Sequence, residues 1–209
     1  MELSILNIKG KETGKKITLP ESVFGIEPND HAIYLDIKRY MANQRQGTHK
    51  SKERAEVDFS TRKLKKQKGT GGARAGSRKS PVFVGGGTIF GPRPRTYDIK
   101  INKKVRDLAR KSALAYKAKE SVVSIIDSLD LKSPKTQDFV DIIASLSKSN
   151  LKTLFILPEI NTNAILSSRN LKRSKVVTVS DINTYDLLNA DRLILVEGSL
   201  SKIEELLNQ

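Results

Sequence analysis

Apolar runs and helical spacings alternate through the last third of the chain. Short runs rich in β-branched residues cover 122–126, 153–157, 176–179 and 193–196. Uninterrupted runs of this kind are typical of strands buried on both faces of a sheet. Helices are predicted between and after these runs. One has Ser133 as its N-cap and Pro134 as its first residue. The others cover 162–168, 181–188 and the residues from Ser199 or Ser201 onward. This alternation predicts a mainly parallel sheet.

The first half of the chain begins with similar elements and then loses them. Strands are predicted at 3–8 and 17–19. A helix is predicted to follow Asn29 or Asp30 as its N-cap. Its apolar side would consist of Ile33, Ile37, Tyr40 and Met41. Another helix begins near Asn102, and its inward face is expected to comprise Val105, Leu108, Ala109, Ser112, Ala115 and Tyr116. Between residues 47 and 96 neither the strand nor the helix period holds.

The expected fold class is therefore α/β, a single open, mainly parallel sheet flanked by helices, with a long extended basic loop inserted between two helices. Residues 1–46 and 97–209 are expected to form the globular domain, and residues 47–96 the loop. An irregular loop of this length inside a compact domain is uncommon unless it has a function.

The positive charge of the chain is concentrated in that loop. The 209 residues carry 38 Lys and Arg against 23 Asp and Glu, a formal net charge of +15. Between Arg62 and Arg95 lie ten basic residues, no acidic residue and eight of the 13 glycines. Glycine and proline exclude a long solvated helix, the usual explanation of a charge run, and dense self-repulsion argues against independent folding. The loop is expected to bind a polyanion.

The residue inventory excludes several classes of enzyme site. The chain has no cysteine and only two histidines, which excludes disulfides, thiolate nucleophiles and histidine-rich metal sites. Gly71 and Gly76 have the spacing of a phosphate-binding loop, but Ser77-Arg78 follow where a lysine and a hydroxyl residue are required. No apolar run could span a membrane and no leader pattern is present, so we expect a cytoplasmic protein with no metal, cofactor or membrane partner.

The loop has the composition of an RNA-binding arm. Lys and Arg neutralise phosphates, and glycine lets the backbone approach RNA without an intervening Cβ. Phe83, Phe90 and Tyr97 are expected either to stack on bases and arginine planes or to pack back on the domain. No pattern of a modular RNA-reading domain is present, which favours irregular folded RNA over duplex DNA as the partner.

Several motifs of the chain resemble one ribosomal protein family. They are Arg45-Gln46-Gly47-Thr48, Arg54-Ala55-Glu56-Val57, Gln67-Lys68-Gly69-Thr70-Gly71, Ala73-Arg74-Ala75-Gly76-Ser77, Gly86-Gly87 with Phe90, and Asn102-Lys103-Lys104. In their order along essentially the whole chain they resemble the bacterial family of large-subunit ribosomal protein four. Gly72 and Lys65 depart from the family pattern, in which arginine and tryptophan are frequent at these two positions.

The resemblance implies a structural, non-enzymatic protein of the large ribosomal subunit. It implies a primary rRNA-binding protein that joins the subunit early, with its globular domain on the outer surface. It also implies that the loop tip lines the constriction of the nascent-polypeptide exit tunnel. The implied partners are large-subunit rRNA, neighbouring ribosomal proteins and the nascent polypeptide, and no homo-oligomer is expected.

The charge pattern and the resemblance together assign two sets of residues. The expected rRNA-binding residues are Arg45, Lys50, Lys52, Arg54, Arg62, Lys63, Lys65, Lys66, Lys68, Arg74, Arg78, Lys79, Arg93, Arg95, Lys103 and Lys104. The expected tunnel tip is Lys66, Gln67, Lys68, Gly69, Thr70, Gly71, Gly72, Ala73 and Arg74.

Two other interpretations of the sequence stay open. A general RNA-binding chaperone or condensing protein would need only the charge of a disordered basic arm, so it would tolerate a scrambled loop. An α/β enzyme acting on RNA would need a cleft with perturbed titratable groups, and the sequence does not locate one.

Overall fold

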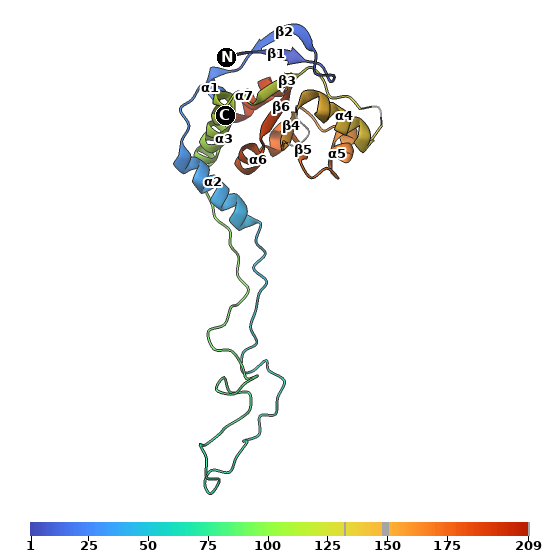
Figure 1. Cartoon of the computed structure of the whole chain (residues 1–209). Coiled ribbons are helices and arrows are strands. Elements are labelled where there is room, and N and C mark those ends of the chain that lie inside the picture. The colour runs from blue at the N-terminus through green and yellow to red at the C-terminus, as the bar shows by residue number, and fades with distance from the viewer. Residues whose placement is uncertain (132, 148–150, 209) are drawn as a thin grey trace. The chain divides into compact units, whose positions relative to one another are not determined.

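The computed structural model describes residues 1–131, 133–147 and 151–208. The chain divides into two compact units, which we call unit 1 (Met1–Tyr40 with Lys100–Gln209) and unit 2 (Met41–Ile99) (Figure 1). Within the described ranges, no helix is long and apolar enough to cross a membrane. Unit 1 contains the sheet and its covering helices.

Unit 1 is built on a six-stranded sheet in the order β2-β1-β3-β6-β4-β5. The strands are β1 (Glu2–Leu6), β2 (Glu12–Thr18), β3 (Val123–Ile126), β4 (Thr153–Leu157), β5 (Ser174–Thr178) and β6 (Arg192–Val196). β1 and β2 pair antiparallel, and every other neighbouring pair is parallel. The expected single, mainly parallel α/β sheet is confirmed.

Helices cover both faces of this sheet (Figure 1). They are α1 (Glu21–Phe24), α2 (Asp30–Asn43), α3 (Lys103–Lys119), α4 (Thr136–Leu146), α5 (Thr162–Ser168), α6 (Thr184–Asn189) and α7 (Ser199–Leu207), with a short 3-10 helix, η1 (Val179–Asp181). On one face, Leu114 of α3 and Ile203 of α7 share a cluster with Ile125. On the other face, the rings of Phe139 and Phe155 lie 5.1 Å apart. Because successive strand residues point to opposite faces, both clusters draw on the same strands, which explains their uninterrupted apolar runs.

Two helices begin later than the sequence predicts. The start at Ser133-Pro134 is wrong: α4 begins after Lys135, whose amide donates to the Ser133 carbonyl at 2.9 Å in a turn. α6 begins after Asn183, because the Asn183 side chain caps it by accepting a hydrogen bond from the Asp186 amide at 2.7 Å. Residues 179–181 form η1 instead.

The amino-terminal hairpin differs from its predicted bounds for a similar reason. β1 ends at Leu6, because Asn7 opens a turn in which its side chain accepts hydrogen bonds from two backbone amides. β2 begins at Glu12 instead of residue 17, and every residue in it except Ile17 is exposed. An edge strand of this kind leaves no apolar pattern in the sequence, and the four residues of α1 are too few to leave a helical one.

The inward faces of α2 and α3 are only partly as predicted. Asn29 caps α2 as expected, accepting a hydrogen bond from the Ala32 amide at 3.0 Å. Met41, which lies beyond the last residue of this part of unit 1, is 56% exposed and not inward. In α3, Leu108 is exposed and Leu114 is fully buried. Both α1 and α6 pack against α3, so its buried face differs from the single stripe that the sequence predicts.

Deleting residues 63–79 should leave unit 1 folded. Both apolar clusters consist of residues outside unit 2, so the deletion removes no side chain from them. The variant is expected to keep one cooperative thermal transition by circular dichroism. Phe155→Ala, which empties a fully buried site, is the destabilised control, with an expected loss of about 3–5 kcal/mol. A deletion variant that unfolds without cooperativity would contradict this independence.

Candidate nucleic-acid interface

Unit 2 is an irregular hairpin of an outgoing and a returning segment. All its residues are described, and after α2 ends at Asn43 none belongs to a helix or strand. Backbone hydrogen bonds join the segments from Arg95 to Gly47 (3.2 Å), Ser51 to Pro92 (3.0 Å), Thr88 to Lys52 (2.9 Å) and Leu64 to Gly76 (3.0 Å). Figure 1 shows the two segments running side by side within this unit. The chain therefore reverses between residues 64 and 76, at the closed end of the hairpin.

Glycine is required where the two segments touch. Gly47 has a φ of 65°, and a Cβ there would lie 2.0 Å from the Arg95 carbonyl oxygen. A Cβ on Gly87 would lie 2.4 Å from the Arg54 backbone nitrogen. A side chain at either position would force the segments apart. These glycines therefore allow the two segments of the hairpin to contact each other. The sequence alone did not distinguish this role from a close approach of the backbone to RNA.

Stacking contacts hold the open end of the hairpin. The Arg45 guanidinium lies 3.8 Å from the centre of the Tyr97 ring, and the Arg95 guanidinium 4.9 Å from it. The Tyr97 hydroxyl is 3.5 Å from Nε2 of His49. The loop aromatics were expected either to stack on bases and arginine planes or to pack back on the domain. Tyr97 stacks on arginine side chains within unit 2.

Two of the expected rRNA-binding cations are paired with carboxylates. Lys50 forms an ion pair with Glu56, and Arg93 forms one with Glu53. The hydrogen bond from Lys50, followed by one from the Glu53 backbone, lowers the pKa of Glu56. The acidic residues belong to the outgoing segment and precede the stretch without acids. Counting charge along the sequence therefore does not reveal that Arg93 is partly neutralised.

Farther along the hairpin, basic side chains surround a hollow of about 620 Å³. Its lining comprises Phe59, Ser60, Arg62, Lys63, Leu64, Lys65, Lys66 and Arg78. The Arg78 guanidinium lies 5.2 Å from the centre of the Phe59 ring. The buried Ser77 hydroxyl donates to the Ser60 carbonyl at 3.1 Å, which joins the two segments here. The structure thus gathers cations that the sequence places on both segments.

The predicted tip, residues 66–74, is exposed throughout. Gly71 has a φ of 63° with open space where a Cβ would lie. Lys68 and Arg74 form no ion pair with any described residue. A Cβ on Gly72 would lie 3.2 Å from the Lys65 ammonium nitrogen. The two positions that depart from the family pattern are therefore neighbours in space.

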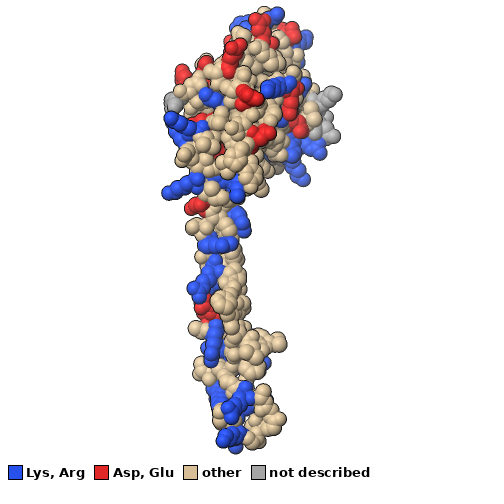
Figure 2. Space-filling model, turned by 90° about the vertical axis from the view of Figure 1, so that its left-hand side faces the viewer, with Lys and Arg blue, Asp and Glu red and all other residues tan. Residues whose placement is uncertain are grey.

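The remaining predicted residues lie in both units. Lys52, Arg54 and Lys79 belong to unit 2, and Lys103 and Lys104 lie exposed in the first turn of α3 in unit 1. Figure 2 shows Lys and Arg side chains at intervals along unit 2 as far as its closed end, with few Asp or Glu among them. The charged side chains at the surface of this unit are therefore mainly cationic.

A basic cluster in unit 1 was not predicted as a site. Arg39 of α2 and Arg106 and Arg110 of α3 lie near the carboxylates of Asp36 and Asp107. The pKa of Arg110 is lowered mainly by burial of its guanidinium group, and the positive charge of the neighbouring Arg106 lowers it further. The Nε atoms of both α3 arginines are buried and find no partner among the described residues. The spacing of four residues between Arg106 and Arg110, which places both on one side of a helix, could have indicated this cluster in the sequence.

The family model that matches the chain is described as the ribosomal protein L4/L1 family, and the match covers residues 17–206. The chain belongs to this family. Relatives named "Large ribosomal subunit protein uL4" include one from Cytophaga hutchinsonii, 67% identical over 208 residues. Others are from Flavobacterium johnsoniae, 57% identical over 209 residues, and Phocaeicola vulgatus, 57% identical over 208 residues. Each match covers 100% of both chains.

Membership of the ribosomal protein L4/L1 family confirms the resemblance drawn from the loop motifs. The family is structural and non-enzymatic, which confirms the prediction that the chain is not an enzyme. Among the described residues, no three His, Asp or Glu side chains gather as ligands for a metal ion.

In the isolated chain, the amides of residues 65–79 should exchange rapidly with solvent. The hydrogen bond from Leu64 to Gly76 closes this end of the hairpin, while neighbouring cations repel one another. Hydrogen exchange read by mass spectrometry is expected to show little protection without RNA and strong protection on large-subunit rRNA. The amides of β4, inside the sheet, provide the protected reference. Strong protection of 65–79 in the free chain would refute the expectation.

Proposed function

We propose that the chain binds large-subunit rRNA through unit 2. As a member of its family, it is a structural constituent of the large ribosomal subunit, which lies in the cytoplasm in bacteria. Its partners there are rRNA and other ribosomal proteins. One observation carries the proposal: an exposed irregular hairpin has ten basic and no acidic residues between Arg62 and Arg95.

An irregular hairpin suits the spaces between folded RNA helices. Its Lys and Arg side chains can neutralise phosphates on both sides, with release of counterions. Backbone N–H groups that are not used within the hairpin can donate to phosphate oxygens. Recognition then depends on the shape of the RNA as well as on its charge.

The same geometry supports an early role in subunit assembly. A charged hairpin with little core becomes ordered by the RNA around it. Folded RNA can enclose both segments only if the hairpin is in place before the RNA closes. The chain thus acts as a primary rRNA-binding protein, and unit 1, whose folded sheet cannot follow between RNA helices, stays on the outer surface of the subunit.

The tip, residues 66–74, lines the nascent-polypeptide exit tunnel in this proposal. Its support is the position of these residues at the closed end of the hairpin, together with the exposure of Lys68 and Arg74. Gly72 in place of arginine makes this side of the constriction less charged and more open. The partners are rRNA, a neighbouring ribosomal protein and the nascent chain; the role requires no cofactor, membrane or second copy of the chain.

A general RNA chaperone or condensing protein is the second candidate, since exposed charge alone would serve it. The close approaches at Gly47 and Gly87 favour the specific role. A chaperone arm would function with any order of the same residues. In this hairpin, any larger residue at either glycine would separate the two segments.

The chain should remain with large subunits through a high-salt wash. For the isolated chain, log affinity for rRNA should fall against log salt by about 0.7 to 0.9 per neutralised phosphate. In the subunit, the enclosing RNA should nevertheless retain the chain. Sedimentation of subunits that carry a tagged chain measures this retention. Recovery mainly in the free fraction would count against integral membership.

Cross-linkers carried by a stalled nascent chain should label residues 68–74. Lys68→Glu should impair nascent-chain passage or the binding of tunnel-blocking drugs, because it reverses a charge at the constriction. Assembly should be largely intact, since Lys68 is one of many cations in the hairpin. Lys15→Glu, an exposed change in β2, is the matched control and should affect neither. If labels map only to unit 1, or never to this protein, the tip assignment is wrong.

A further inference from the structure

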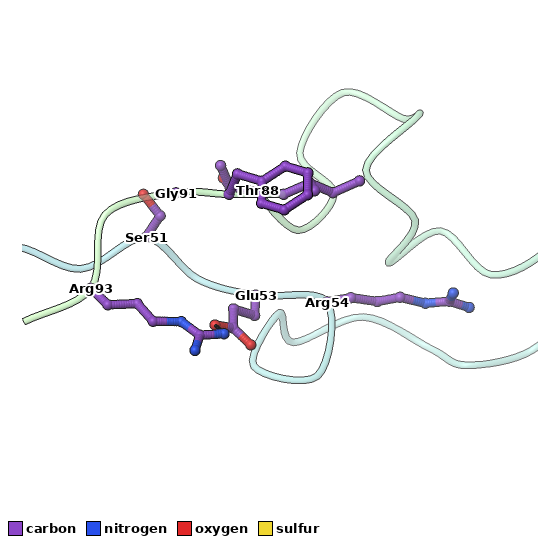
Figure 3. Close-up of a pocket in the computed structure, with 8 residues that line it drawn as sticks. Ser51, Glu53, Arg54, Thr88, Gly91 and Arg93 are labelled. Carbon is purple, nitrogen blue, oxygen red and sulfur yellow. Dashed lines mark ion pairs between the residues drawn. The ribbon is translucent and has the colours of Figure 1, made fainter.

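A hollow distinct from the tip lies between the outgoing segment 51–54 and the returning segment 88–93 of unit 2 (Figure 3). Its volume is about 670 Å³, within the range of sites that hold small ligands. Figure 3 shows Ser51 and Gly91 facing each other across the two segments. The Arg93 side chain is directed at Glu53, and that of Arg54 points away from this pair.

Phe90, which also lines this hollow, has its ring in solvent. The residue is 103% exposed and has a φ of 54°. A left-handed backbone is rare and costly for a bulky side chain, and an exposed ring forgoes apolar burial. Conformations of this kind persist where the surroundings fix them, and they cluster at ligand sites.

Contacts of the backbone on both sides of Phe90 fix this conformation. On one side of Phe90, the Thr88 amide donates to the Lys52 carbonyl at 2.9 Å. On the other side, Gly91 approaches Ser51 so closely that a Cβ would lie 2.6 Å from the Ser51 Cβ. Phe90 thus lies between two residues that contact the outgoing segment, and these contacts leave its ring directed into solvent.

The charges of the hollow favour an anionic ligand. Glu53 is paired with Arg93, so its carboxylate is neutralised. Arg54 forms no ion pair with any described residue and leaves the hollow with a net positive charge. Ser51 and Thr88 add hydroxyl groups that can donate or accept hydrogen bonds.

We propose that this hollow binds one unpaired nucleotide of rRNA, with its base stacked on Phe90 and its phosphate held by Arg54. The inference rests on the proposed rRNA-binding function and adds a base-binding site to it. An aromatic platform beside a cation is the chemistry by which proteins bind unstacked bases. The free guanidinium and the hydroxyl groups favour a nucleotide over an apolar side chain of a neighbouring protein.

The test measures the affinity of the full chain for large-subunit rRNA of the same species by filter binding. Phe90→Ala should weaken binding roughly 5-fold to 100-fold, the effect of losing one base stack. The salt slope should not change, because no charge is removed. Phe90→Trp should retain tight binding, and Phe90→Leu should bind as weakly as the alanine variant. Ultraviolet irradiation should also join a nucleotide to Phe90, identified by mass spectrometry.

Two matched variants separate the ring from other effects. Val84→Ala changes a residue that is 99% exposed and outside the hollow, and it should leave the affinity unchanged. Phe90→Gly removes the ring but adopts a left-handed backbone without strain, so it should bind as weakly as Phe90→Ala.

Unchanged affinity of Phe90→Ala would overturn the nucleotide site, while the salt slope of the unaltered chain would still report rRNA binding. Full affinity of Phe90→Leu, with Phe90 cross-linked to protein in intact subunits, would assign the hollow to a neighbouring protein and also overturn the inference. Failure of the unaltered chain to bind rRNA would instead contradict the proposed function itself.

Discussion

Mutual repulsion among the Lys and Arg side chains of unit 2 is the constraint on which the organisation of the chain depends. Within residues 41–99, all of which are described, Val57 is the one large apolar side chain that is buried. Apolar burial on this scale cannot offset both the repulsion and the conformational entropy of ordering the segment. The hairpin therefore depends on countercharge from outside, whereas unit 1 holds two apolar clusters of its own.

The parallel part of the sheet could be predicted because its central strands, β3, β4 and β6, are buried on both faces. β4 coincides with the apolar run 153–157, and α5 with the predicted helix 162–168. The errors in the limits of α6 and β1 arise where local hydrogen bonds, not burial, begin or end the element. Asn183 caps α6 through its side chain, and Asn7 ends β1 by the same kind of bond. Short polar side chains serve equally in caps, turns and loops, so their role becomes definite only in the folded chain.

The charge of the interface could also be predicted, but not its internal pairing. Glu53 and Arg93 are forty positions apart in the sequence, and no strand period defines the register that brings them together. Tyr97 and Phe90 illustrate the same limit. Both are aromatic residues in a basic loop, yet Tyr97 contacts two arginine guanidinium groups and Phe90 is exposed. Their difference depends on where the returning segment meets the outgoing one.

The polar edge strand β2 has a consequence for the chain before it meets RNA. An open sheet edge presents unpaired N–H and C=O groups, which can pair with the edge of another molecule. Lys15 and Lys16 follow each other in that edge strand, both exposed, with their side chains on opposite faces of the sheet. Two copies that approached edge to edge would bring these ammonium groups together. The lysines of this edge strand thus oppose the growth of sheets shared between copies of the chain.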